Sequence, residues 1–230
     1  MRHENLTGFA LHQRKYRERS YILHFFSEKF GRVDGVIRQV PPSLYHYASL
    51  QANGKSELKN FSQLDVQGQP FYLQQRALFA GFYLNEILLR LLPLEEPMPE
   101  TYQAYAHALL DLKLLPAQDP NDHKLKLILR KFETIFLNEL GYQLDYTQDA
   151  IGQEIQPNLH YQLIPKEGFI SSNSVHAIMG SDLLKLAQDE QIHSENMSLL
   201  GKLYRTLFND LLGNKPLKSR QLWISQQQRT

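Results

Sequence analysis

Four cations lie within six residues near the start of the sequence, beside two aromatic rings. These cations are Arg14, Lys15, Arg17 and Arg19. Tyr16 and Tyr21 stand among and beside them. Loop cations can neutralise phosphates and neighbouring rings can stack on bases, which is what sequence-independent binding of nucleic acid requires. The alternative is a solvated loop whose tyrosines belong to the core.

A second group of cations follows a strongly periodic apolar segment near the other end of the sequence. Two residues after Gly213 the chain reads Lys215-Pro216, and two further cations follow, Lys218 and Arg220. A helix that ends at the glycine places the first of these cations where the helix dipole and its free carbonyls favour positive charge. The basic character continues beyond the single turn over which the dipole acts. This run therefore indicates nucleic acid or another acidic partner.

Short strands are expected to carry the first cationic group. Apolar and β-branched or aromatic runs alternate with turn residues, a pattern typical of strands. The predicted strands are Leu6 to Leu11, Tyr21 to Phe26, Val33 to Ile37, Tyr45 to Leu50 and Leu58 to Val66. Five short strands in this length predict a small Greek-key barrel of the OB type. Its remaining candidate contacts to nucleic acid are Arg32, Arg38, Lys55 and Lys59.

Helices are expected after residue 75, because the hydrophobic period changes there. The predicted helices are Ala77 to Leu92, Pro99 to about Leu115, a third from Asn121 or Asp122 to Gly141, and two more capped by Ser181 and Ser194. Signals weaken over residues 142–180, where we expect an irregular insert with a hairpin of His160 to Ile164 and Phe169 to Ile170. The sequence thus predicts an α+β protein, with an OB-fold domain over 1–75 and a mainly helical domain over 76–230.

The formal charge of +1 is distributed unevenly along the 230 residues. Residues 1–75 carry ten Lys/Arg against six Asp/Glu, and residues 195–230 carry six against two, so each end is +4. Residues 76–116 carry three against five and residues 117–194 six against eleven, which makes the middle acidic. Whether the two basic ends meet on one surface is open at this level.

Composition and motifs exclude several classes of protein. Absence of cysteine rules out disulfides, thiolate metal sites and cysteine catalysis. No run reaches the ~18 apolar residues of a membrane span, and the start of the chain lacks the apolar core of a signal peptide, so we expect a cytoplasmic location. Phosphate-loop, nucleophile-elbow and zinc-protease motifs do not occur. We expect no catalytic residue, no cofactor and no metal.

Several segments, taken in order, resemble the RecO family of bacterial recombination mediators. They are residues 8–33, 81–93, 129–142, 166–170 and 213–223. The last of them, which contains KPLKSR after an apolar helix, is the most specific. The resemblance implies an OB-fold followed by a helical domain, as the strand and helix patterns do independently.

The resemblance also implies a function in DNA repair and recombination, within the RecF pathway. It implies binding of single- and double-stranded DNA and annealing of strands coated with single-stranded DNA-binding protein (SSB). With RecR, the protein would help to load RecA at the nucleoid. The family binds the acidic tail of SSB on its helical domain, in an apolar pocket rimmed by cations. Our candidates for that rim are Arg130, Lys131, Lys202 and Arg205, which could equally form a solvated helix face.

Two features depart from the family pattern. Many relatives hold zinc with two Cys-x-x-Cys pairs around the segment that here spans Thr147 to Ile178, and this chain has no cysteine. The family's long basic loop after Val36 is shortened to IRQVPPSLYHY, in which Arg38 is the only Lys or Arg.

Three hypotheses follow. The first is a DNA-binding and annealing mediator. The second is an adaptor recruited by the SSB tail and RecR, in which the shortened loop has removed most of the intrinsic affinity for DNA. The third is an uncharacterised hydrolase that uses the insert, for which metal- or nucleotide-dependent turnover would be the test.

Overall fold

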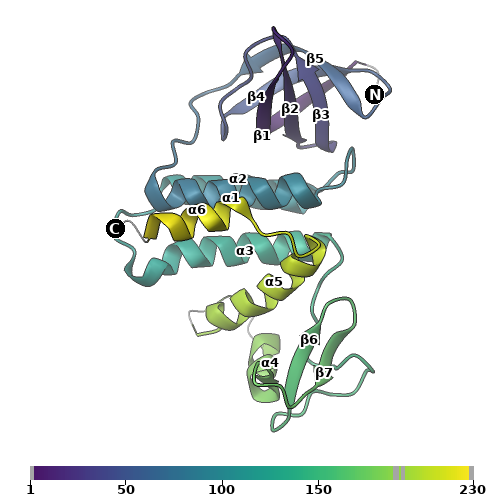
Figure 1. Cartoon of the computed structure of the whole chain (residues 1–230), viewed down its shortest axis with the longest axis vertical. Coiled ribbons are helices and arrows are strands. Elements are labelled where there is room, and N and C mark those ends of the chain that lie inside the picture. Colours follow the sequence, from purple (N-terminus) through teal and green to yellow (C-terminus); the bar gives the residue numbers. More distant parts are fainter. Residues whose placement is uncertain (1–2, 189–191, 193–194, 228–230) are drawn as a thin grey trace. The chain divides into compact units, whose positions relative to one another are not determined.

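The computed structural model describes residues 3–188, 192 and 195–227. The chain forms two compact units (Figure 1). One comprises Met1–Asp119 with Pro216–Thr230, and the other comprises Pro120–Lys215. The end of the chain thus returns to the unit that contains its beginning.

A closed barrel of five strands forms the first part of the first unit. The strands are β1 (Glu4–Tyr16), β2 (Ser20–Ser27), β3 (Gly31–Ile37), β4 (Tyr47–Asn53) and β5 (Leu58–Val66). They are hydrogen-bonded in the order β1-β2-β3-β5-β4, and β4 pairs back to β1. Only the β3–β5 pair is parallel among these ladders. The five strands were each predicted from the sequence, and the OB-type fold is confirmed.

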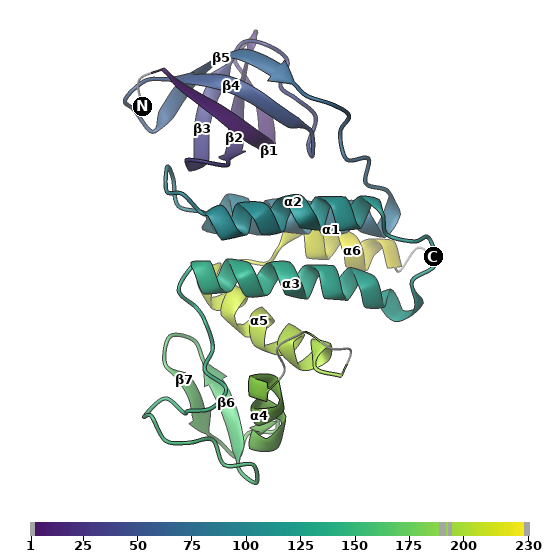
Figure 2. The ribbon, with the colours of Figure 1, turned by 180° about the vertical axis from the view of Figure 1, so that it is seen from behind.

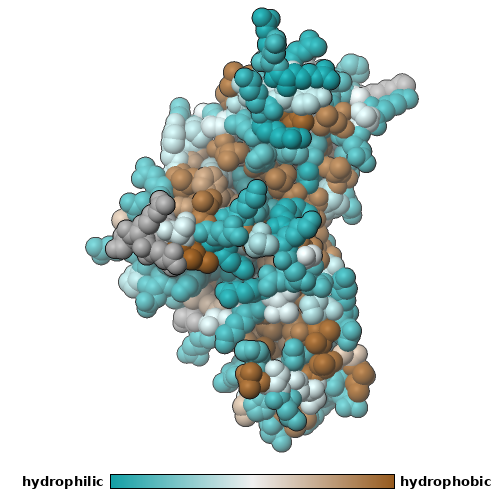
Figure 3. Space-filling model, in the orientation of Figure 1, coloured by the Kyte–Doolittle hydropathy of each residue, from teal (hydrophilic) through white to brown (hydrophobic). Residues whose placement is uncertain are grey.

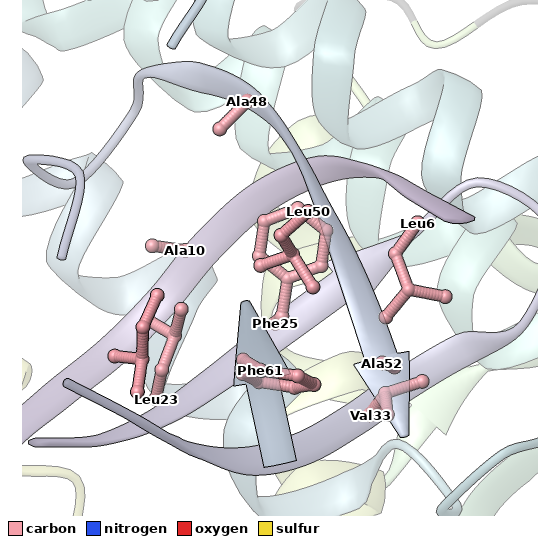
Figure 4. Packing of buried hydrophobic residues seen from close by; sticks show 10 residues of the cluster. Leu6, Ala10, Leu23, Phe25, Val33, Ala48, Leu50, Ala52 and Phe61 are labelled. Atoms are coloured by element: carbon pink, nitrogen blue, oxygen red, sulfur yellow. The ribbon is translucent and has the colours of Figure 1, made fainter. Parts of the chain in front are cut away.

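The barrel interior is filled by apolar side chains that alternate along the strands. Leu23 and Phe25 of β2 are fully buried, as are Val33 and Ile37 of β3. Figure 4 shows how side chains from all five strands converge on the barrel axis. Because side chains alternate across a strand, the residues between these positions lie on the outer surface of the barrel.

Part of that outer surface is covered by α1 (Gln75–Leu91) and α2 (Pro99–Lys113). Phe9 and Phe26 of the barrel contact the ring of Tyr102 of α2, with centroids 6.0 and 5.3 Å apart. Pro99 occupies the first turn of α2, where a missing N–H costs nothing. The barrel and α2 therefore share an aromatic core.

A helix that the sequence did not indicate ends the chain. It is α6 (Lys218–Gln227), which lies beside α1 in both ribbon views (Figures 1 and 2). Leu217 is buried just before it, and the ring of Trp223 packs edge-on against Phe79 of α1 at 5.8 Å. The weak periodicity of KSRQLWISQQ hid this helix, because its contact with α1 depends on few apolar residues.

The second unit is built from helices and a small sheet. After a single 3₁₀ turn (Pro120–Asp122), its helices are α3 (His123–Glu139), α4 (Gly180–Gln188) and α5 (Met197–Leu211). The sheet contains β6 (His160–Ile164), β7 (Gly168–Ser171) and β8 (Ile178–Met179) in the order β7-β6-β8. The expected hairpin is confirmed, and β8 adds a third strand.

The predicted helix caps are only partly found. Asp122 precedes α3 but has a left-handed backbone and makes no capping bond with its side chain. Ser181 lies inside α4, which begins one residue earlier at Gly180. Ser194 lies outside the described residues, and α5 begins after Asn196. Helix identity followed from periodicity. The Ser181 cap was wrong because α4 already begins at Gly180, and Asp122 stands at the expected cap position without the expected side-chain bond.

Candidate nucleic-acid interface

An open hollow on the barrel combines cations, a ring and polar groups. It lies where the β1–β2 turn, the end of β3 and β5 meet, and it has a volume of about 530 Å³. Arg17 and Arg38 line it, together with Tyr16 and Phe61. The guanidinium carbon of Arg17 lies 5.0 Å from the centre of the Tyr16 ring. Such a surface can hold a phosphate on the arginines while a base stacks on the ring.

The other cations of the β1–β2 region are exposed. Arg14, Lys15 and Arg19 all project to solvent, as does Lys55 in the β4–β5 connection. Hydrophilic side chains cover most of the barrel's upper end in Figure 3. These exposed cations can contact a polyanion directly, and neutralising its phosphates releases bound counterions, which favours binding.

Two predicted contacts are instead engaged in internal ion pairs. Lys59 is 2% exposed, and its ammonium lies 2.5 Å from a carboxylate oxygen of Glu95. Arg32 forms two hydrogen bonds with Asp34, at 3.0 and 2.7 Å, and another with the backbone oxygen of Leu89. Neither side chain is available at the barrel surface in the way that Arg17 is.

A compact ionic cluster surrounds Asp34 on the outside of the barrel. Burial raises the pKa of Asp34, but hydrogen bonds from His24 and Arg32 outweigh it and leave the pKa below the ordinary value. The ring of His12 lies 5.7 Å from that of His24. Burial lowers the pKa of His12, with further contributions from His24, Arg14 and Lys218. Cations from both ends of the chain, Arg14 and Lys218, therefore contribute to the lowered pKa of His12.

The basic run at the end of the chain is divided between the two units. Lys215 belongs to the second unit, whereas Lys218 and Arg220 belong to α6 in the first. Lys218 is exposed and Arg220 is half-buried. The first unit thus contains the barrel cations and the α6 cations together. His12 was not among the sequence candidates, because nothing in its local pattern reveals that α6 lies nearby.

The rim cations proposed for the second unit have different surroundings. Arg130 of α3 forms an ion pair with Glu133 at 2.7 Å, and that carboxylate is 1% exposed. Lys131, Lys202 and Arg205 are exposed. Lys202 also borders a hollow of about 660 Å³ that is lined in part by Leu199, Leu203 and Met179.

The described residues offer neither a metal site nor a membrane span. Within the described ranges, no group of three or more His, Asp or Glu could hold a metal ion. No helix in this part of the chain is both long and apolar enough to cross a bilayer.

Comparison with known proteins identifies the family. Residues 1–69 match the family model for the recombination protein O N terminal, and residues 74–221 match that for its C terminal. A DNA repair protein RecO from Pseudoalteromonas atlantica is 33% identical, with 96% of this chain and 94% of the relative covered. DNA repair proteins RecO from Glaesserella parasuis and Pseudomonas aeruginosa are each 34% identical, covering 95% and 96% of this chain and 94% of each relative.

The fold and these matches define a class of DNA repair proteins that join an OB-type barrel to a helical domain. Within that class, the chain belongs to the RecO family.

Proposed function

We propose that this chain is a recombination mediator that binds single- and double-stranded DNA and anneals complementary strands coated with SSB. With RecR, it helps to load RecA, and it acts without catalytic chemistry in the cytoplasm at the nucleoid. Membership of the RecO family supports this function. The observation that carries the DNA-binding part is the barrel hollow, in which Arg17 and Arg38 flank exposed polar groups and the Tyr16 ring.

The hollow suits a strand without sequence preference. Guanidinium groups hold phosphates through charge, and stacking on a ring tolerates any base. The shortened loop after Val36 leaves Arg38 at the edge of this hollow, so a cation of that loop still faces the same surface as Arg17. Binding through the barrel is therefore proposed to persist despite the loss of the longer basic loop.

The test is fluorescence anisotropy of a labelled single-stranded oligonucleotide, measured over a range of salt concentrations. Arg17→Gln/Arg38→Gln is compared with Lys29→Gln/Lys113→Gln, which removes the same charge elsewhere in the first unit. We expect the first variant to weaken binding and to lower the slope of log K against log salt by about 1.4, since each phosphate contact contributes about 0.7 on single strands. Equal losses in both variants would contradict a role for the hollow, and no binding by the folded wild type would contradict direct DNA binding.

A second function, that of an adaptor recruited by the SSB tail, has its own supporting observation. Lys202 stands beside apolar side chains of α5 and the insert, at the edge of a hollow that could hold an apolar residue of an acidic peptide. Titration of a labelled peptide with the SSB tail sequence against Lys202→Glu, with Lys126→Glu as control, tests it. Loss of peptide binding in the Lys202 variant alone would support the adaptor.

A further inference from the structure

Two adjacent residues of α1 hold segments that lie at opposite ends of the sequence. The first, Asn85, is buried, and its amide nitrogen donates a hydrogen bond to the backbone oxygen of Leu11 at 2.9 Å. Its amide oxygen accepts a bond from the Tyr105 hydroxyl at 2.6 Å. This network fixes β1 to α1 at the residue directly before His12.

The second, Glu86, binds the start of α6. Its carboxylate accepts hydrogen bonds from the backbone N–H of Lys218 at 2.9 Å and of Ser219 at 2.8 Å. The Ser219 hydroxyl donates a third bond, at 2.7 Å. The first N–H groups of a helix have no partner within the helix, and the positive end of the helix dipole favours a carboxylate there. Glu86 therefore acts as an N-terminal cap supplied by another helix.

Further contacts hold α6 in this place. Arg90, one turn after Glu86, donates to the backbone oxygen of Pro216 at 3.4 Å. Ser219 is 4% exposed, and Trp223 packs on Phe79. Lys218 is exposed at the start of α6, and Arg14 is exposed on β1. Burial lowers the pKa of His12, and the charges of His24, Arg14 and Lys218 lower it further.

Arg14 and Lys218 are both exposed cations, so an anion can reach each of them from solvent. Arg14 and His12 lie on the same face of β1, because side chains two residues apart share a face. Asn85 holds the residue before His12 and Glu86 holds Lys218, and these two are adjacent residues of α1. Two cations, Arg14 and Lys218, and the ring of His12 thus belong to one region of the first unit, and Arg14 connects this region to the β1–β2 turn that borders the barrel hollow.

We propose that Glu86 is a positioning residue, which holds the start of α6 on α1 so that Lys218, Arg14 and His12 form one surface for the phosphates of a DNA strand. This inference rests on the proposed function and extends the DNA path from the barrel hollow to the C-terminal helix. The KPLKSR segment then has two roles: its backbone and Ser219 dock on Glu86, while Lys218 contacts DNA.

The sign of the effect separates this role from simple electrostatics. Glu86→Ala removes a negative charge, and Coulomb attraction alone predicts tighter binding of DNA. Positioning predicts weaker binding, because Lys218 is no longer held beside Arg14. Glu96→Ala, which removes an exposed carboxylate elsewhere in the first unit, is the matched control.

The experiment measures anisotropy of a labelled single strand against full-length protein at several salt concentrations. We expect Glu86→Ala and Lys218→Gln each to weaken binding by about three- to ten-fold and to lower the salt slope by about 0.7. The double variant should bind no more weakly than either single one, because both changes remove the same contact. Glu96→Ala should bind as tightly as the wild type or slightly more tightly.

Trp223, the only tryptophan of the chain, reports the docking of α6 independently. Glu86→Ala should shift its emission to the red and increase its quenching by acrylamide, whereas Lys218→Gln should change neither. Ser219→Ala keeps the carboxylate and the backbone bonds, so it serves as a milder variant if Glu86→Ala lowers the folded fraction seen by circular dichroism. It should weaken DNA binding in the same direction.

The outcomes distinguish this inference from the proposed function. If the wild type does not bind DNA, both are overturned. If the wild type binds and the Glu86 and Ser219 variants bind as tightly as Glu96→Ala, only the positioning role is overturned. If Lys218→Gln binds DNA as tightly as the wild type, the α6 part of the proposed surface is rejected, and the proposal for the barrel hollow is unaffected.

Discussion

Lys59 and Arg17 are both cations of the barrel region, but Lys59 is buried in an ion pair whereas Arg17 is exposed at the hollow. Lys59 is almost fully buried, pairs with Glu95 and donates a further bond to the backbone oxygen of Ser56 at 2.6 Å. Arg17 is exposed beside Tyr16 at the hollow. A buried ion pair costs much to break, whereas an exposed cation costs little to remove from the fold.

This difference predicts unequal effects of two substitutions on stability. Glu95→Gln leaves the buried ammonium of Lys59 without its carboxylate, and we expect it to lower the free energy of unfolding by about 2–4 kcal/mol. Lys59→Met leaves Glu95, which is 31% exposed and can be solvated, so we expect a loss of only about 0–1 kcal/mol. Urea denaturation followed by circular dichroism measures both. Lys59→Met should also retain the DNA affinity of the wild type. A large loss of affinity in this folded variant would show that Lys59 does take part in DNA binding.

At the scale of elements, α1 connects more of the first unit than any sequence pattern indicated. Its residues bind β1 through Asn85 and α6 through Glu86, and its Gly81 lies against the side chains of Leu73 and Tyr45. A Cβ at Gly81 would lie 2.7 Å from Leu73 Cδ1 and 2.8 Å from the Tyr45 hydroxyl. The glycine is therefore needed for close packing.

Gly81→Ala tests this packing against helix propensity. Alanine favours a helix over glycine by about 1 kcal/mol. We nevertheless expect a net loss of about 1–2 kcal/mol in the free energy of unfolding, because the added methyl group forces side chains apart. Gly201→Ala in α5 is the control, since its Cβ would meet only the end of the Arg130 side chain, at 3.2 Å. We expect that change to stabilise by about 0.5–1 kcal/mol, and a stabilising Gly81→Ala in the same denaturation series would refute tight packing at α1.

On the scale of the whole molecule, charge is divided between the two compact units. The first unit carries sixteen Lys/Arg against twelve Asp/Glu, and the second carries nine against twelve. The return of α6 to the first unit adds its cations to those of the barrel. An excess of positive charge on one unit raises the local concentration of a polyanion there.

Photo-crosslinking to a bromodeoxyuridine-substituted single strand tests this division. We expect crosslinked peptides from the β1–β2 turn, the end of β3 and the start of α6, because the proposed surface contains these segments. Mass spectrometry of tryptic fragments identifies them, with high salt as a control that should abolish the crosslinks. A majority of crosslinks in α3 or α5 would contradict the proposed surface and would show that DNA binds the second unit.

Local patterns of residues were enough to predict the order and type of most elements. Alternation along 21–26 and 33–37 and the apolar stripes of residues 77–92 and 99–115 depend on neighbours in the chain, so local pattern was enough. It also located the cationic segments, since composition is read directly. The hairpin of the insert followed from two short apolar runs between turn residues.

Which cations are exposed and which are paired depends on how the chain folds. Lys59 meets Glu95, Arg32 meets the backbone oxygen of Leu89, and the start of α6 meets Glu86 across 132 residues of sequence. The residue before His12 and the start of α6 are likewise brought to neighbouring residues of α1 only by the fold. Burial and Coulomb interaction depend on distance through space, which local periodicity does not encode.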